Sequence, residues 1–224
     1  MAGNLRAFLA EFVGTFGWVF FAAGAVCADA ATHGALGPVG VALATGLGVA
    51  AVFGMLGRAS IGLFNPALTL ALAAARRIDW TRGALAFVSQ LLGAACAGLL
   101  LAQLFGLTLP PSEAPHLGTP LPVGLGFRAA TLLEAVLTFF LALAAMGGGG
   151  RSAAARALVV GAAAGAAALV AGPLTGAALN PARAFGPAVA SGFWSQHYVF
   201  WFGPAAGAAV AAFLTRFVFD DRQT

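Results

Sequence analysis

The chain alternates long apolar stretches with short polar connections, a pattern that is typical of membrane helices. A helix needs roughly 20 apolar residues to cross the hydrocarbon core of a bilayer. Stretches of about that length or longer are Leu5–Cys27, Val39–Gly57, Thr81–Gly106, Arg128–Gly147, Ala153–Pro173 and Tyr198–Phe219. The short alternating segments that build a membrane β-barrel do not occur. The pattern therefore predicts an all-α membrane protein with six spans.

Two further apolar segments, Pro66–Ala75 and Pro181–Ala190, are too short to cross a bilayer as helices. Irregular backbone at membrane depth is tolerated only where it is buried in protein or lines a water-filled cavity. We therefore interpret both segments as re-entrant half-helices whose free ends face such a cavity.

Composition supports a lipid environment, because 61% of the 224 residues are hydrophobic, 8% are charged and the mean hydropathy is +0.94. Soluble domains carry about a quarter charged residues. The basic residues are spread between apolar runs, which argues against a nucleic-acid-binding face. Cys27 and Cys96 have no metal or redox spacing, and no catalytic arrangement is present. We expect no metal, no cofactor, no nucleic-acid partner and no enzyme activity.

The arginines predict the orientation of the chain. Nine of the eleven lie at the chain ends or close to the second-to-third and fourth-to-fifth connections: Arg6, Arg58, Arg76, Arg77, Arg82, Arg151, Arg156, Arg216 and Arg222. With six spans these positions share one side of the membrane, which the positive-inside rule assigns to the cytoplasm. We expect a multi-pass protein of the cell membrane, plasma or inner, with both termini cytoplasmic.

Two motifs occur once in each half of the chain. They are Glu11-Phe-Val-Gly-Thr15 with Glu134-Ala-Val-Leu-Thr138, and Asn65-Pro66-Ala67 with Asn180-Pro181-Ala182. Because three spans per half is an odd number, the second half must be inverted relative to the first. The prediction is a single domain, 1–224, in which inverted repeats of about 1–107 and 128–224 are joined by an outer loop, 108–127. Such repeats place a functional site at the membrane midplane.

Each Asn-Pro pair predicts the start of a half-helix, because Asn is a favoured N-cap and Pro a favoured first helical residue. In an inverted repeat the two N-termini meet near the bilayer centre, and each carries about half a positive charge. Such a point repels cations, and a water molecule that accepts from the Asn amides there cannot relay protons. The alternative is that each Asn only caps its helix.

These motifs resemble the aquaporin, or major intrinsic protein, family over nearly the whole chain. The matching residues are Ser60-Ile-Gly-Leu-Phe-Asn65-Pro-Ala-Leu-Thr69, Thr175-Gly-Ala-Ala-Leu-Asn180-Pro-Ala-Arg183-Ala-Phe-Gly186-Pro, Glu11, Gln90, Glu134 and Phe200-Trp201-Phe-Gly203-Pro204. The resemblance implies a homotetramer of six-span subunits with one pore in each. It also implies that Glu11 and Glu134 accept hydrogen bonds from the half-helix loops, with proton coupling as the alternative.

The resemblance further implies that Thr45, Ala168, Ala177 and Arg183 form a selectivity filter in which Arg183 repels cations. Water-strict members have a bulky aromatic residue and a histidine where this chain has Thr45 and Ala168, so we expect a wider and more apolar filter. Ala184 departs from the Asp of the glycerol-facilitating branch. Leu63 also departs from the family, because many members have a histidine there.

The leading functional hypothesis is a passive channel for water and small uncharged solutes. One alternative is a channel for larger neutral solutes, such as boric, silicic or arsenous acid, glycerol, urea or ammonia, with water secondary. Another is a secondary transporter, which would need an ionisable residue free in the pathway. We interpret His33, His116 and His197 as solvated loop residues. The four tryptophans fall mostly near span ends and are interpreted as interfacial anchors.

Overall fold

A computed structural model describes residues 2–106, 116–147 and 152–219. Within these ranges the chain forms eight α-helices, one 3-10 turn and no strand. The helices are α1 (Ala2–Ala31), α2 (Gly37–Leu56), α3 (Pro66–Ala74), α4 (Trp80–Phe105), α5 (Phe127–Met146), α6 (Ala153–Thr175), α7 (Pro181–Ser191) and α8 (Val199–Phe219), and the 3-10 turn is η1 (His116–Gly118). All except α3 and α7 are long and apolar enough to cross a membrane. The predicted fold class is confirmed.

The ends of α1 show why hydropathy alone misplaces helix boundaries. The helix extends beyond the predicted span Leu5–Cys27 at both ends, because helical hydrogen bonding continues past the apolar stretch. It stops where His33 and Gly34 adopt φ angles of 53° and 87°, in the left-handed region. Asp29 Oδ1 then accepts hydrogen bonds from Leu36 N (2.9 Å) and Gly37 N (2.8 Å), which fixes the turn into α2.

The helices pack in pairs, most extensively α2 with α6, α5 with α8 and α1 with α4. Small residues let the backbones approach closely. A Cβ atom added to Gly46 of α2 would lie 2.8 Å from the carbonyl oxygen of Gly161 on α6. One added to Gly98 of α4 would lie 2.1 Å from the carbonyl oxygen of Gly186 on α7. The abundance of glycine therefore has a direct use in these contacts.

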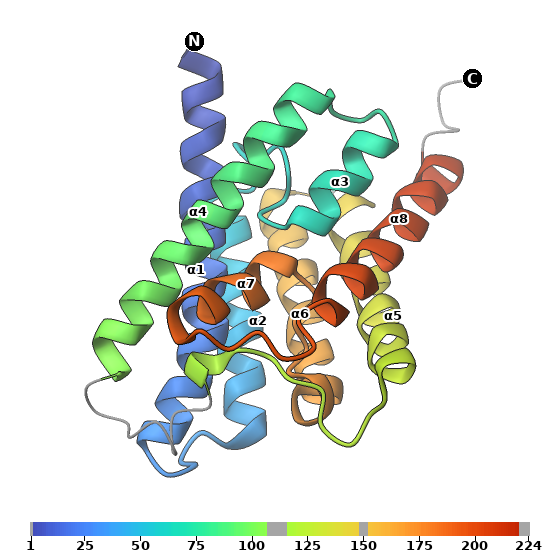
Figure 1. Ribbon diagram of the computed structural model, residues 1–224. Helices are drawn as coiled ribbons and strands as arrows, with labels where there is room; N and C mark the ends of the chain where they lie inside the picture. The colour runs from blue at the N-terminus through green and yellow to red at the C-terminus, as the bar shows by residue number, and fades with distance from the viewer. Residues whose placement is uncertain (1, 107–115, 148–151, 220–224) are drawn as a thin grey trace.

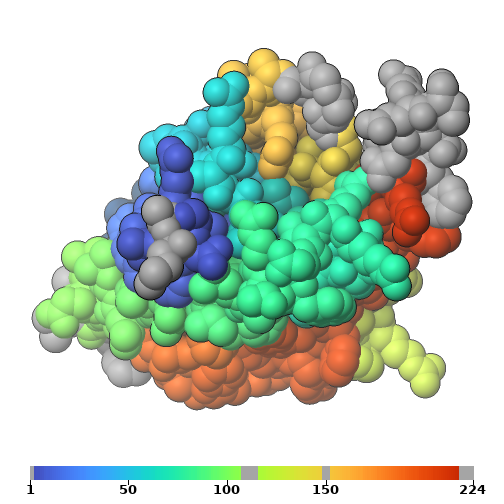
Figure 2. All heavy atoms as spheres, turned by 90° about the horizontal axis from the view of Figure 1, so that it is seen from above, coloured from blue at the N-terminus to red at the C-terminus, as the bar shows by residue number. Residues whose placement is uncertain are grey.

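The half-helices α3 and α7 lie between the long helices α4 and α8, at the front of the molecule in the view of Figure 1. α3 packs on α4 and α8, α7 packs on α4 and α1, and the two touch each other. α1 begins and α8 ends at the same end of the molecule, the end that carries the α3–α4 turn (Figure 1). Figure 2 looks down on this end, with the start of α1 and the start of α4 toward the viewer.

Most of the arginines used to orient the chain lie at this end, and one of them has an unexpected environment. Arg156 is half-buried inside α6, and its guanidinium carbon lies 5.9 Å from the ring centroid of Phe53 on α2. Several residues used in the sequence analysis lie outside the described ranges: Arg151, Arg222 and residues 108–115 of the outer loop.

Candidate functional site: a junction of two half-helices below an outer cavity

The two Asn-Pro-Ala motifs meet at the N-termini of α3 and α7. Asn65 and Asn180 have nearly identical extended backbones, with φ of −148° at both and ψ of 115° and 113°. Each side-chain oxygen accepts a hydrogen bond from the backbone two residues on, Ala67 N at 2.9 Å and Ala182 N at 3.0 Å. Each asparagine therefore caps its own half-helix, as an N-cap does.

The same asparagines also join the two half-helices. Asn65 Nδ2 donates to the carbonyl oxygen of Leu179, and Asn180 Nδ2 donates to that of Phe64, both at 2.9 Å. Each acceptor belongs to the residue immediately before the other asparagine. An amide nitrogen has two hydrogens, so one N–H of each remains for another acceptor. Capping alone therefore does not account for the full geometry of the pair.

Glu11 of α1 holds the loop that leads into α3. Its Oε1 accepts from Ser60 Oγ (2.5 Å), Ile61 N and Gly62 N (both 2.7 Å), and its Oε2 accepts from Phe64 N (3.0 Å). Leu63 and Phe64 have left-handed φ angles of 60° and 57°. The carboxylate is fully buried, so it satisfies backbone groups that lipid and protein would otherwise leave unpaired.

Glu134 of α5 does the same for the loop that leads into α7. It accepts from Thr175 Oγ1 (2.6 Å), Ala178 N (3.1 Å) and Leu179 N (2.8 Å). Leu179 has a left-handed φ of 56°, which matches the twist before the first asparagine. Both glutamates are thus engaged with the half-helix loops, which leaves neither as a free ionisable group in a pathway.

A polar network around Gln90 of α4 supports only the first loop. Gln90 Nε2 donates to Glu11 Oε2 (2.7 Å) and Thr69 Oγ1 (2.8 Å), and Thr69 Oγ1 reaches the carbonyl oxygen of Gly62 at 2.8 Å. Gln90 and Thr69 are fully buried. Both residues belong to the family motifs of the sequence, but their role was not predictable from those motifs. An uncharged polar residue within an otherwise apolar span was the signal available for Gln90.

A cavity of about 390 Å³ lies between the asparagine pair and the end of the molecule opposite the termini, and we call it the outer cavity. All four predicted filter residues line it, namely Thr45, Ala168, Ala177 and Arg183. Its remaining wall comes from α1, α2, η1 and the end of α6, including Ala22, Val26, Asp29, His116 and Gly172. The structure therefore brings together residues from α2, α6, the loop before α7 and α7 itself.

The side chains that line this cavity are mostly small and apolar, and the guanidinium of Arg183 is the cation among them. Arg183 is buried, and its Nη1 donates to the carbonyl oxygen of Gly118 in η1, which also lines the cavity. Thr45 donates its hydroxyl to Val41 of its own helix at 2.9 Å. The threonine hydrogen is thus already used, and the alanines add no polar group. Arg183 and Asp29 are the two side chains of opposite charge among the residues that line this cavity.

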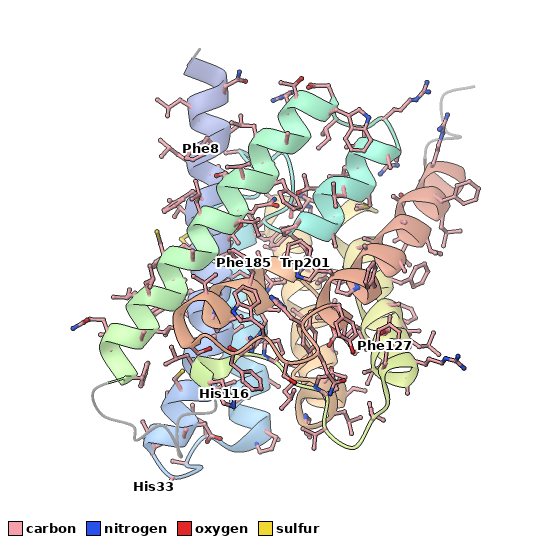
Figure 3. All side chains as sticks on the ribbon, viewed as in Figure 1. Phe8, His33, His116, Phe127, Phe185 and Trp201 are labelled. Carbon is pink, nitrogen blue, oxygen red and sulfur yellow. The ribbon has the colours of Figure 1, made fainter. Side chains whose placement is uncertain are left out.

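The three histidines differ in their surroundings. Figure 3 shows His33 and His116 toward the end of the molecule opposite the termini. Both are exposed, and His116 stacks on Phe193 with 3.6 Å between ring centroids. For His197 the prediction of a solvated residue is wrong: its side chain is buried against Trp194, with ring centroids 4.7 Å apart, and Trp201. Burial lowers the pKa of His197.

Trp18 also departs from its interpretation as an interfacial anchor. Its side chain is 1% exposed and packs in the core with Phe53, Leu63 and Phe64. Trp80 and Trp194, in contrast, are exposed near helix ends. Trp18 lies on the same face of α1 as Glu11 and Thr15, both fully buried, so the polar residues of the repeated motif were the available sign that this face is interior.

Six spanning helices, packed with two half-helices whose N-termini meet, are the architecture of a membrane channel. The chain's fold matches the X-ray structure of the aquaglyceroporin from Plasmodium falciparum with a TM-score of 0.86 over 97% of this chain and 98% of that one, at 24% identity. The family model for the major intrinsic proteins matches residues 1–215. The chain belongs to this family, whose members are channels for water and small solutes and not enzymes.

Curated relatives agree with this assignment. The chain is 41% identical to "Probable aquaporin TIP3-2" of Oryza sativa subsp. japonica, covering 98% of this chain and 84% of the relative. It is 40% identical to "Aquaporin TIP4-4" of Zea mays, covering 94% and 85%. It is 34% identical to "Aquaporin NIP1-1" of Oryza sativa subsp. japonica, covering 93% and 72%.

Proposed function

We propose that the protein is a passive channel that conducts water and small uncharged solutes and excludes ions and protons. The observation that carries the proposal is the junction of Asn65 and Asn180, where two helix N-termini meet and each amide keeps one N–H for a passing oxygen. The two partial positive charges repel cations. A water molecule that accepts from both amides points its own hydrogens away, which interrupts proton relay.

The outer cavity extends the proposal to solutes larger than water. Thr45, Ala168 and Ala177 present small side chains there, and Arg183 supplies the charge that disfavours cations. This combination suits small neutral solutes that form hydrogen bonds, of which glycerol, urea, ammonia and boric, silicic or arsenous acid are candidates. A coupled transporter is disfavoured, because Glu11 and Glu134 are occupied by backbone and hydroxyl donors.

The proposal includes the organisation of the chain. Residues of about 1–107 and 128–224 form inverted repeats in one channel domain. This is supported by the matching contacts that Glu11 and Glu134 each make with one half-helix loop, and by the reciprocal hydrogen bonds of Asn65 and Asn180 to the residue before the other asparagine. The working assembly is a homotetramer in the cell membrane, with both termini cytoplasmic. The orientation rests on the arginines, which gather at the end of the molecule that carries both termini.

Stopped-flow light scattering on proteoliposomes tests the function. Vesicles that contain the protein should shrink faster than empty vesicles in a sucrose gradient, with a flux that does not saturate and does not depend on ions. Arg183→Val should increase proton entry, followed with a trapped pH-sensitive dye, because the cationic barrier is removed. Vesicles that shrink no faster than empty ones, or a saturable ion-dependent flux, would refute the channel.

A further inference from the structure

The outer cavity ends at the level of the filter residues, and the side chains one turn further in are closed off from it. On three helices a cavity-lining residue is followed, four residues toward the asparagine pair, by one that does not line the cavity. The pairs are Ala22 and Trp18 on α1, Thr45 and Val49 on α2, and Ala168 and Ala164 on α6. Four residues correspond to about 6 Å along a helix. Trp18, Val49 and Ala164 are at most 1% exposed, whereas Thr45 and Ala168 are each 8% exposed.

Large aromatic side chains gather one to two helical turns further from the outer cavity than the filter residues. The Trp18 ring meets Phe53 of α2 edge-on, with 6.1 Å between centroids, and Phe53 meets Phe64 in the same way at 5.2 Å. Gly14, one turn below Trp18 on α1, leaves room for the Phe64 ring, because a Cβ atom there would lie 2.2 Å from a Phe64 ring carbon. We call Trp18, Phe53 and Phe64 the inner aromatic cluster.

This cluster is joined directly to the asparagine pair. Phe64 immediately precedes Asn65, and its carbonyl oxygen accepts the hydrogen bond from Asn180 Nδ2. On the side of the termini the guanidinium of Arg156 lies 5.9 Å from the centroid of the Phe53 ring, within cation–π range. Phe64 and Phe53 therefore connect the asparagine junction to a cation near the inner end of the bundle, and Trp18 joins them one turn inward of the cavity-lining Ala22.

We propose that the inner aromatic cluster, and not the outer four-residue filter, sets the largest solute that the channel passes; this rests on the proposed channel function. The outer wall is small at Thr45, Ala168 and Ala177, whereas the bulk of Trp18 and Phe53 lies one to two turns further in. Rings present mostly carbon, so a polyol must give up hydrogen bonds to water there with little replacement, which is costly. Water is smaller and gives up fewer hydrogen bonds, so the barrier falls more heavily on the polyol.

The test compares the permeability of proteoliposomes to water, urea and glycerol by stopped-flow light scattering. Trp18→Ala and Phe53→Ala should each raise the ratio of glycerol to water permeability several-fold. Trp80→Ala is the matched control, because it removes the same side chain from an exposed site at the start of α4 and should leave the ratio unchanged. Trp18→Phe, a smaller ring in the same place, should give an intermediate rise.

The outcomes separate the two proposals. If native vesicles conduct water while the Trp18 and Phe53 variants keep the native ratio, the inner cluster does not set the size limit and this inference is overturned. If Trp18→Ala does not assemble, judged by size-exclusion chromatography, then Trp18→Phe and Phe53→Ala decide by the same ratio. Native vesicles that do not conduct water would instead refute the channel function.

Discussion

Replacing Glu11 by alanine should destabilise the protein more than the matching replacement of Glu134. Glu11→Ala leaves the N–H groups of Ile61, Gly62 and Phe64 without their acceptor, whereas Glu134→Ala strands two, those of Ala178 and Leu179. An unsatisfied buried N–H costs about 1–3 kcal/mol, so the losses are about 3–9 and about 2–6 kcal/mol. Because both glutamates are fully buried and the substitution is identical, the cavity cost is similar in the two variants.

The measurement is thermal unfolding of purified protein in detergent, followed by tryptophan fluorescence. An extra loss of about 1–3 kcal/mol corresponds to a Tm roughly 2–12 °C lower for Glu11→Ala than for Glu134→Ala at this chain length. Glu11→Gln should fall between Glu11→Ala and the native protein, because one amide oxygen can replace Oε1 but not Oε2. Asp79→Ala is the baseline, since it removes a single exposed N-cap bond to Arg82 N.

Two results would contradict this reasoning. Equal Tm losses for Glu11→Ala and Glu134→Ala would mean that the number of stranded N–H groups does not determine the cost. A loss no larger than that of Asp79→Ala, for which about 0.5–2 kcal/mol is expected, would mean that the buried carboxylates do not support the half-helix loops. Either result would also remove the reason for treating these residues as scaffold.

Two further predictions concern stability. Burial lowers the pKa of His197 below its usual value near 6.5, so the unfolded chain binds more protons than the folded one, and the free energy of unfolding should fall as the pH drops below about 6.5. His197→Phe should flatten this dependence in Tm scans between about pH 5 and pH 8. An unchanged slope would refute the prediction. Gly98→Ala should lower Tm, because its Cβ atom would lie 2.1 Å from the Gly186 carbonyl oxygen. Gly54→Ala in α2 would meet only Ala157 Cβ, at an ordinary 3.7 Å, and should not lower Tm, because alanine has the higher helix propensity.

The helix starts at the site were predictable from the sequence. The hydrogen-bond partners of the site residues were not. An Asn-Pro pair identifies a helix start wherever it occurs, so the starts of α3 and α7 at Pro66 and Pro181 followed directly. The groups that donate hydrogen bonds to Glu11 lie 49–53 residues away in the chain, and nothing local to either segment encodes that distance. The resemblance to a known family supplied this expectation, and the Gln90 network shows how much detail it leaves open.

By itself, the sequence determined the number of spans, the two half-helices and the end of the molecule at which the arginines gather, because hydropathy, helix capping and charge are properties of short segments. Only the tertiary structure decided which face of each span is interior. A span surrounded by lipid is apolar on all sides, so the amphipathic stripe that marks the buried face of a soluble helix is weak. For this reason Phe53 and Arg156 were indistinguishable in the sequence from lipid-facing or orienting residues. Their packing places Phe53 in the core beside Phe64 and leaves Arg156 half-buried over the Phe53 ring.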